Sequence, residues 1–138
     1  MKNTGCIKPD VEYVIESANA LSSAIECIAL GSVLEGEKYD YFYDYGLSLY
    51  TVYEINGDEK ILLESISSYH RALSYISFEN SPYEYANTQY CLGNALYYQG
   101  QSTNDIDVYN HALKAFEETT RSYPDMNDRV FLRRCMLR

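Results

Sequence analysis

A pattern of small and aromatic residues occurs twice in this chain, at an offset of 47 residues. Every member of the first copy returns in the second as the same residue or one of similar type. The first copy comprises Tyr43, Gly46, Leu49, Tyr50, Asp58, Ile61, Ser65, Ile66 and Tyr69, and the second comprises Tyr90, Gly93, Leu96, Tyr97, Asp105, Val108, Ala112, Leu113 and Phe116. A repeat of this length predicts stacked supersecondary units that share one continuous core.

Apolar residues in both copies recur at spacings of three and four, which indicates amphipathic helices. The first copy covers residues 37–80 and the second covers residues 81–124, each as two helices separated by a break. The first break is an Asn-Gly-Asp turn that ends at Asp58, and the second follows a helix that is expected to end near Gly100. Because aspartate accepts hydrogen bonds from the first free N–H groups of a helix, Asp58 and Asp105 are predicted to cap the helices that follow.

Two further segments extend this pattern to the whole chain. Residues 9–31 begin with Pro-Asp, carry an apolar stripe and predict an N-terminal helix. Residues 125–138 place apolar side chains among arginines and predict a helix that caps the open end of the stack. In the first copy, the second helix is expected to include Ile76 and to stop before Pro82. The sequence thus predicts one all-α domain over residues 1–138, with about six helices in antiparallel hairpins.

Two glycines occupy equivalent positions inside the predicted helices of the two copies. A glycine within a helix costs about 1 kcal/mol relative to alanine, so another interaction is expected to offset that cost at Gly46 and Gly93. Close approach of the second helix of each hairpin is the expected interaction, and Ser65 and Ala112 are small for the same reason. A large residue at Gly93 is therefore expected to destabilise its hairpin.

These residues resemble the tetratricopeptide repeat (TPR) family, whose signature has the form W-x₂-L-G-x₂-Y, then A-x₃-F, then P. The match in the second copy consists of Leu92, Gly93, Leu96, Ala112, Phe116 and Pro124, and that in the first of Phe42, Tyr45, Gly46, Leu49, Ser65 and Tyr69. The family unit is about 34 residues long, so the present period is an extended one. The resemblance implies hairpins stacked into a right-handed α-α superhelix.

The resemblance also implies a binding surface, because the first helix of each family unit lines a concave groove. The corresponding positions here are Asp40, Tyr43, Leu47, Tyr50, Thr51, Asn87, Tyr90, Asn94, Tyr97 and Tyr98. Their tyrosines suit an extended peptide or an amphipathic helix, or alternatively they pack against the neighbouring repeat. Only Asn94 matches the family's carboxylate-binding set, so an acidic groove suited to a neutral, apolar or basic segment is expected instead.

Charge and cysteine usage narrow the classes of partner. Residues 1–120 carry six basic and eighteen acidic side chains, whereas residues 121–138 carry five arginines and two aspartates. An acidic body repels phosphate backbones, which argues against nucleic acid. The basic end either contacts an acidic partner or places cations near a helix C-terminus. The four cysteines have no metal-site spacing and no apolar run has membrane length, so a cytoplasmic, reduced protein without a membrane segment is expected.

Signatures of catalysis and of cofactors are not evident in the sequence. His70 and His111 occupy different repeat positions without triad or metal-ligand spacing and are expected to be surface residues. Asp105-Ile106-Asp107 lacks the glycine and the later glutamate of a calcium loop, and no glycine-rich phosphate loop is present. We therefore expect a protein that is not an enzyme and needs no cofactor, with an unrecognised catalytic site as the weakest alternative.

Two functional hypotheses follow from these expectations. The first is a scaffold or adaptor that binds a peptide or helix of a partner protein through the tyrosine-rich face. The second is a structural module that associates with its own copies or within a larger complex, because three hairpins are close to the minimum for such a stack. The first hypothesis predicts a monomer or a weak homodimer in solution.

Overall fold

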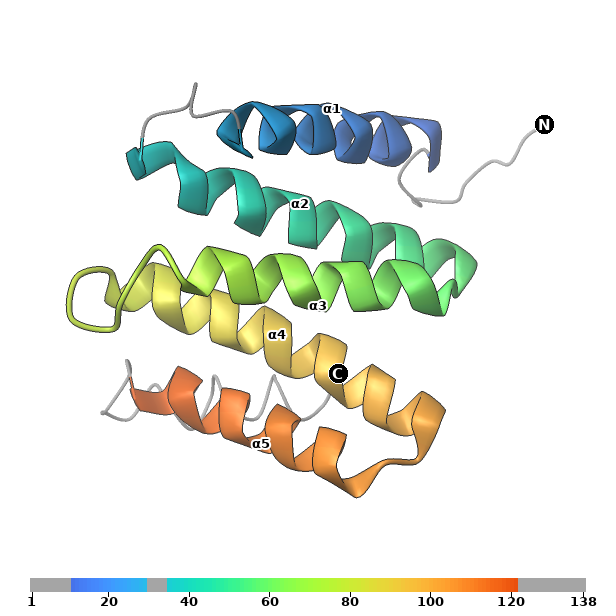
Figure 1. Cartoon of the computed structure of the whole chain (residues 1–138). Helices are drawn as coiled ribbons and strands as arrows, with labels where there is room; N and C mark the ends of the chain where they lie inside the picture. Colours follow the sequence, from blue (N-terminus) through green and yellow to red (C-terminus); the bar gives the residue numbers. More distant parts are fainter. Residues whose placement is uncertain (1–10, 30–34, 122–138) are drawn as a thin grey trace, which may run out of the picture.

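The computed structural model describes residues 11–29 and 35–121, which form five α-helices and, within these ranges, no strands (Figure 1). The helices are α1 (Val11–Ala29), α2 (Glu35–Asn56), α3 (Glu59–Leu73), α4 (Pro82–Thr103) and α5 (Ile106–Arg121). This confirms the all-α class and a helical hairpin in each of the two copies. The helix predicted over residues 125–138 lies outside the described residues, and so does Pro124.

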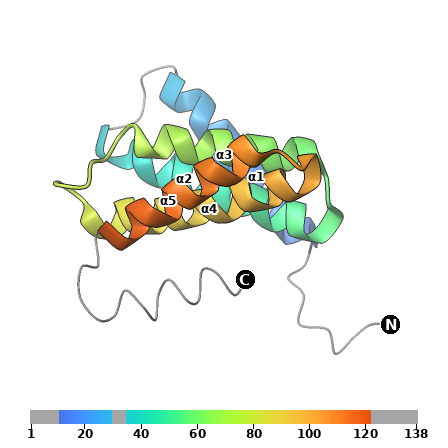
Figure 2. The same cartoon turned by 90° about the horizontal axis from the view of Figure 1, so that it is seen from below.

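The helices follow one another in chain order across the molecule, and consecutive helices run antiparallel (Figures 1 and 2). Each packs against its neighbours in sequence, with the most extensive contacts inside the two hairpins, α2 with α3 and α4 with α5. Helix α4 also packs against α3 and so joins the first hairpin to the second. A row of this kind leaves α4 covered by α3 on one side and by α5 on the other.

The predicted caps are present at the start of the second helix of each hairpin. An Asp58 carboxylate oxygen accepts a hydrogen bond from the Lys60 N–H at 3.0 Å, and Asp105 accepts one from the Asp107 N–H at 2.9 Å. Each side chain thereby satisfies an N–H group that has no partner within its own helix. The second helix of each copy therefore begins with the same aspartate capping hydrogen bond.

Two predicted helix ends are wrong. Helix α3 stops at Leu73, and the following residues form turns in which Tyr75 stacks on Phe42 at a centroid distance of 5.7 Å. Ile76 packs against the same aromatic cluster without being helical. Helix α4 continues past Gly100 to Thr103 and ends at Asn104, whose φ of 55° is left-handed. Apolar spacing alone does not distinguish a packed turn from a further helical turn.

The close approach predicted at the two repeat glycines is confirmed. A Cβ atom added to Gly46 would lie 2.6 Å from the Tyr69 ring, and one added to Gly93 would lie 2.6 Å from the Phe116 ring. Ser65 donates a hydrogen bond to the Gly46 carbonyl at 2.7 Å, which fixes α3 against α2 at the same point. Only glycine allows the aromatic ring of the facing helix to lie directly on the helix backbone.

The core runs through both hairpins and is built mainly by the repeat residues. Its largest fully buried side chains, Tyr69 and Leu62, lie on α3, which faces α2 on one side and α4 on the other. The buried core cluster comprises Tyr50, Leu62, Ile66, Tyr69, Leu92, Ala95, Leu96, Ala112 and Ala115. Side chains from α2, α3, α4 and α5 all enter this cluster, so the two hairpins share one continuous core, as stacked units require.

Candidate functional site

Tyrosines of the predicted groove pack between the two hairpins. Tyr43 on α2 is half-buried, and its hydroxyl lies 3.8 Å from the Cys91 sulfur on α4. Burial raises the pKa of the Tyr43 hydroxyl, and the neighbouring Cys91 adds to that rise. Tyr50 is buried in the core, with its ring 6.3 Å from that of Tyr98. These side chains join the hairpins, which leaves little of their ring surface for a partner.

The other predicted groove residues divide into packed and exposed members. Leu47 packs against the core, Asn94 is buried, and the half-buried Tyr90 ring lies 6.4 Å from that of Phe116. The residues with accessible side chains are Asp40, Asn87 and Tyr97. The structure therefore gathers only part of the predicted site on a free surface, and partner binding by these three residues stays a prediction.

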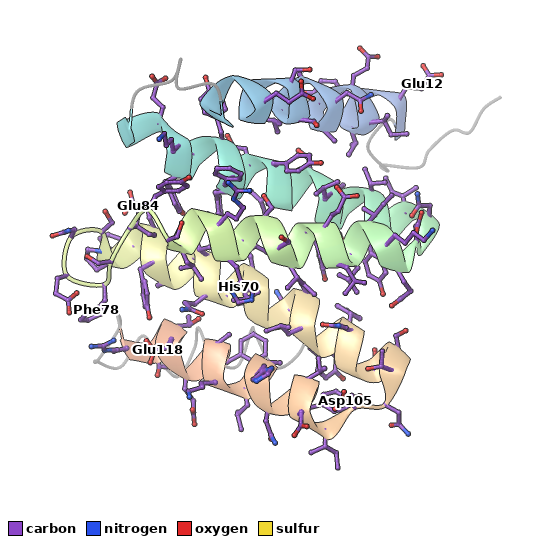
Figure 3. The ribbon with its side chains drawn as sticks, in the orientation of Figure 1. Glu12, His70, Phe78, Glu84, Asp105 and Glu118 are labelled. Atoms are coloured by element: carbon purple, nitrogen blue, oxygen red, sulfur yellow. The ribbon has the colours of Figure 1, made fainter. Side chains whose placement is uncertain are left out.

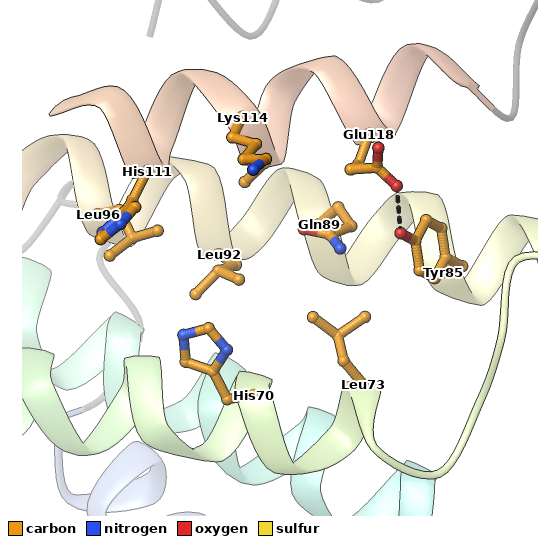
Figure 4. A pocket seen from close by; sticks show the side chains of 10 residues that line it. His70, Leu73, Tyr85, Gln89, Leu92, Leu96, His111, Lys114 and Glu118 are labelled. Atoms are coloured by element: carbon orange, nitrogen blue, oxygen red, sulfur yellow. Dashed lines mark hydrogen bonds between the residues drawn. The ribbon is translucent and has the colours of Figure 1, made fainter. Parts of the chain in front are cut away.

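A cavity of about 450 Å³ lies between α3 and α5, with α4 beneath it (Figure 4). Its apolar lining is Leu73 from α3, Leu92 and Leu96 from α4, and Ala115 from α5. Its polar lining is His70, Tyr85, Gln89, His111, Lys114 and Glu118. We refer to this space as the α3–α5 cleft. An apolar base surrounded by a few polar groups is typical of a binding site.

Helical spacing explains why these side chains meet in the α3–α5 cleft. Leu92 and Leu96 are four residues apart on α4, so they occupy one face of that helix. His111, Ala115 and Glu118 recur at spacings of four and three on α5, again on one face. Since α4 packs against both α3 and α5, its leucine face lies between the two helices. Figure 3 shows His70 on α3 and Glu118 on α5, on the two sides of α4.

One end of the cleft is held by hydrogen bonds. The Tyr85 hydroxyl on α4 donates to the Glu118 carboxylate on α5, as the dashed line in Figure 4 shows. Arg121 pairs with the same carboxylate at 3.2 Å. Burial and this hydrogen bond to an anion both raise the pKa of Tyr85, so the phenol stays protonated and acts as the donor. The negative charge of Glu118 is thus already engaged within the protein.

The other end of the cleft carries nitrogen groups. His70 and His111 are exposed, as predicted, yet they line the same cavity from facing helices. The His70 side chain is nevertheless partly desolvated, which lowers its pKa, and the nearby His111 lowers it further, so both effects favour the neutral imidazole. Lys114 lies one turn beyond His111, and no carboxylate in the described part of the chain forms an ion pair with it. This end therefore has cationic capacity that no carboxylate among the described residues neutralises by an ion pair.

The 47-residue repeat does not relate the two histidines of the cleft to each other. His70 and His111 are 41 residues apart, six fewer than the repeat offset, so they are not equivalent positions of the two copies. They meet because α3 and α5 lie on the two sides of α4, a relation between hairpins that repeat alignment does not describe. The available signal was the helical spacing of the polar residues His111, Lys114 and Glu118 on one face of α5.

Among residues 11–29 and 35–121, no group of three or more His, Cys, Asp or Glu side chains is placed to hold a metal ion. None of the described helices combines the length and apolar character needed to cross a membrane. Comparison with protein-family models, curated proteins and solved structures finds no significant match to this chain.

Proposed function

We propose that this chain is a non-catalytic helical-repeat scaffold, similar to TPR proteins, that binds a segment of a partner protein. The 47-residue offset and the matched contacts at Gly46 and Gly93 support the stacking of equivalent hairpins that such a superhelix requires. The observation that carries the binding role is the α3–α5 cleft, in which Leu73 is the accessible apolar side chain above the buried Leu92 and Leu96.

The cleft suits this role better than the tyrosine-rich face. Tyr43 and Tyr50 already serve as packing between hairpins, whereas Leu73 lines a cavity of about 450 Å³. That volume falls within the range of roughly 300–1,000 Å³ found for ligand sites. Protein interfaces likewise combine an apolar centre with a polar rim. Asp40, Asn87 and Tyr97, the exposed members of the predicted groove, are the alternative contact residues.

Selection from a displayed library of random peptides, with the full chain as the target, tests this function. We expect the selection to enrich a related family of sequences that binds with a Kd of about 1–100 μM, typical of a modest surface cleft. Leu73→Glu is expected to weaken that binding at least about tenfold, because a carboxylate replaces an apolar contact in the cleft. The affinities are measured by fluorescence anisotropy with labelled peptides.

The matched control is Leu63→Glu, the same substitution on the same helix. Leu63 is 49% exposed and does not line the cleft, so this variant should bind within about twofold of the original chain. Circular dichroism establishes that both variants remain helical. If no sequence family is enriched, the binding function is wrong. Stable dimers detected by light scattering in that case favour the self-association hypothesis.

A further inference from the structure

The backbone of the α3–α5 cleft restricts the form of a bound segment. All ten lining residues lie within helices, beyond the first three positions of each, so their N–H groups are already bonded along the helix. An extended peptide entering the cleft would find no backbone donors for its own carbonyl groups. A helix satisfies its own backbone and needs only side-chain contacts, so the cleft favours a helical segment.

The charges of the cleft restrict the composition of that segment. Lys114 lines the cleft with no carboxylate paired to it in the described part of the chain. Glu118, at the other end, already accepts hydrogen bonds from Tyr85 and Arg121. Among the described residues, the uncompensated charge of the cleft is therefore positive, although the chain as a whole carries a net charge of −9. Lys114 and its two histidine neighbours complement an acidic side chain.

We propose that the α3–α5 cleft binds an amphipathic helix of a partner protein, with apolar side chains against Leu73, above the buried Leu92 and Leu96, and a carboxylate beside Lys114. This inference rests on the proposed function and specifies its ligand. Apolar side chains spaced by three and four residues enter between α3 and α5, as in other helix-in-groove complexes. The carboxylate lies between His70 and His111, where it forms charge-assisted hydrogen bonds.

The same arrangement predicts binding that strengthens in acid. In the free protein, burial and the facing His111 hold the pKa of His70 below its usual value of 6.5. The charged or titratable groups that line the cavity with it are His111, Lys114, the engaged Glu118 and Tyr85, whose raised pKa keeps the phenol neutral. A bound carboxylate favours the charged imidazole and raises the pKa of His70, so the complex takes up protons. Affinity therefore rises as the pH falls below about 6.5.

The test uses two synthetic helical peptides of about 15 residues, taken from the most enriched family of the library selection. They are identical except for one position beside the apolar stripe, which is Glu in one peptide and Lys in the other. The Glu peptide is expected to bind the full chain at least about tenfold more tightly than the Lys peptide at pH near 7. Lowering the pH from about 7.5 to about 5.5 should tighten Glu-peptide binding several-fold.

Two variants with the same change in charge identify the responsible lysine. Lys114→Glu should abolish the preference for the Glu peptide, whereas Lys60→Glu, at the exposed start of α3, should retain it. His70→Gln should reduce the acid dependence of Glu-peptide binding. Equal binding of the two peptides, or equal effects of the two lysine variants, would overturn the acidic-helix inference while the binding function stands. Enrichment of extended or proline-rich sequences would do the same, and an empty selection would overturn both.

Discussion

Replacing Gly46 by leucine is expected to lower the free energy of unfolding by about 3 kcal/mol, through overpacking of the first hairpin. The added side chain must displace the Tyr69 ring, which already lies 2.6 Å from the position of a Cβ atom. Tyr69 is only 1% exposed and is enclosed by the core, so its ring has no free space to enter. The better helix propensity of leucine returns less than about 1 kcal/mol of this loss.

The equivalent change at Gly93 is expected to cost less, about 1–2 kcal/mol. The ring that must move there belongs to Phe116, which is only half-buried on the last described helix. Urea denaturation followed by circular dichroism measures both values. Ser67→Leu, at an exposed position of α3, is the control and should change stability by less than about 0.5 kcal/mol. An unchanged midpoint for Gly46→Leu would mean that α2 and α3 do not approach each other as described.

Raising the pH from 10 to 12 is expected to unfold the protein, because buried tyrosines must ionise. Burial is the main cause that raises the pKa of Tyr39 from the ordinary value of 10.0 to about 12. Burial also raises the pKa values of Tyr43 and Tyr69. For Tyr39, the folded-state pKa lies above the unfolded-state value, so its stabilising contribution is complete below pH 10 and is lost as the pH rises to 12.

The shift at Tyr39 alone corresponds to a loss of at most about 3 kcal/mol at high pH. Near-ultraviolet absorbance reports phenolate formation, and circular dichroism reports helix content in the same titration. The buried tyrosines Tyr39, Tyr43 and Tyr69 should ionise only together with the loss of helix. In Tyr39→Phe, the free energy of unfolding should fall less steeply between pH 10 and 12. Complete ionisation near pH 10 with intact helices would contradict the buried positions of these rings.

Small residues and caps were predictable from the sequence because their physical requirements are local. Gly46 and Gly93 signal a close helix approach whatever the geometry of the rest of the stack. Asp58 and Asp105 cap the helices that begin beside them. The end of α3 was not predictable in the same way. Ile76 continues the apolar spacing of that helix, although it contributes to packing from the connection that follows the helix.

The candidate site depended on relations between hairpins, which no single position of the sequence reveals. Tyr43 and Tyr50 follow one amphipathic pattern that suits either a groove or an interface between repeats, and their contacts with Cys91 and Tyr98 place them at the interface. The α3–α5 cleft arises only when α4 separates α3 from α5. Its histidine pair therefore combines positions that the repeat offset does not relate.

The location of a bound helix tests the account most directly. Amide chemical shifts of the full, nitrogen-15-labelled chain would be followed while the selected Glu peptide is added. We expect the largest changes at His70, Leu73 and Lys114, around the α3–α5 cleft. Changes concentrated at Asp40, Asn87 and Tyr97, with none around the cleft, would show that the partner binds the tyrosine-rich face instead and would contradict the proposed site.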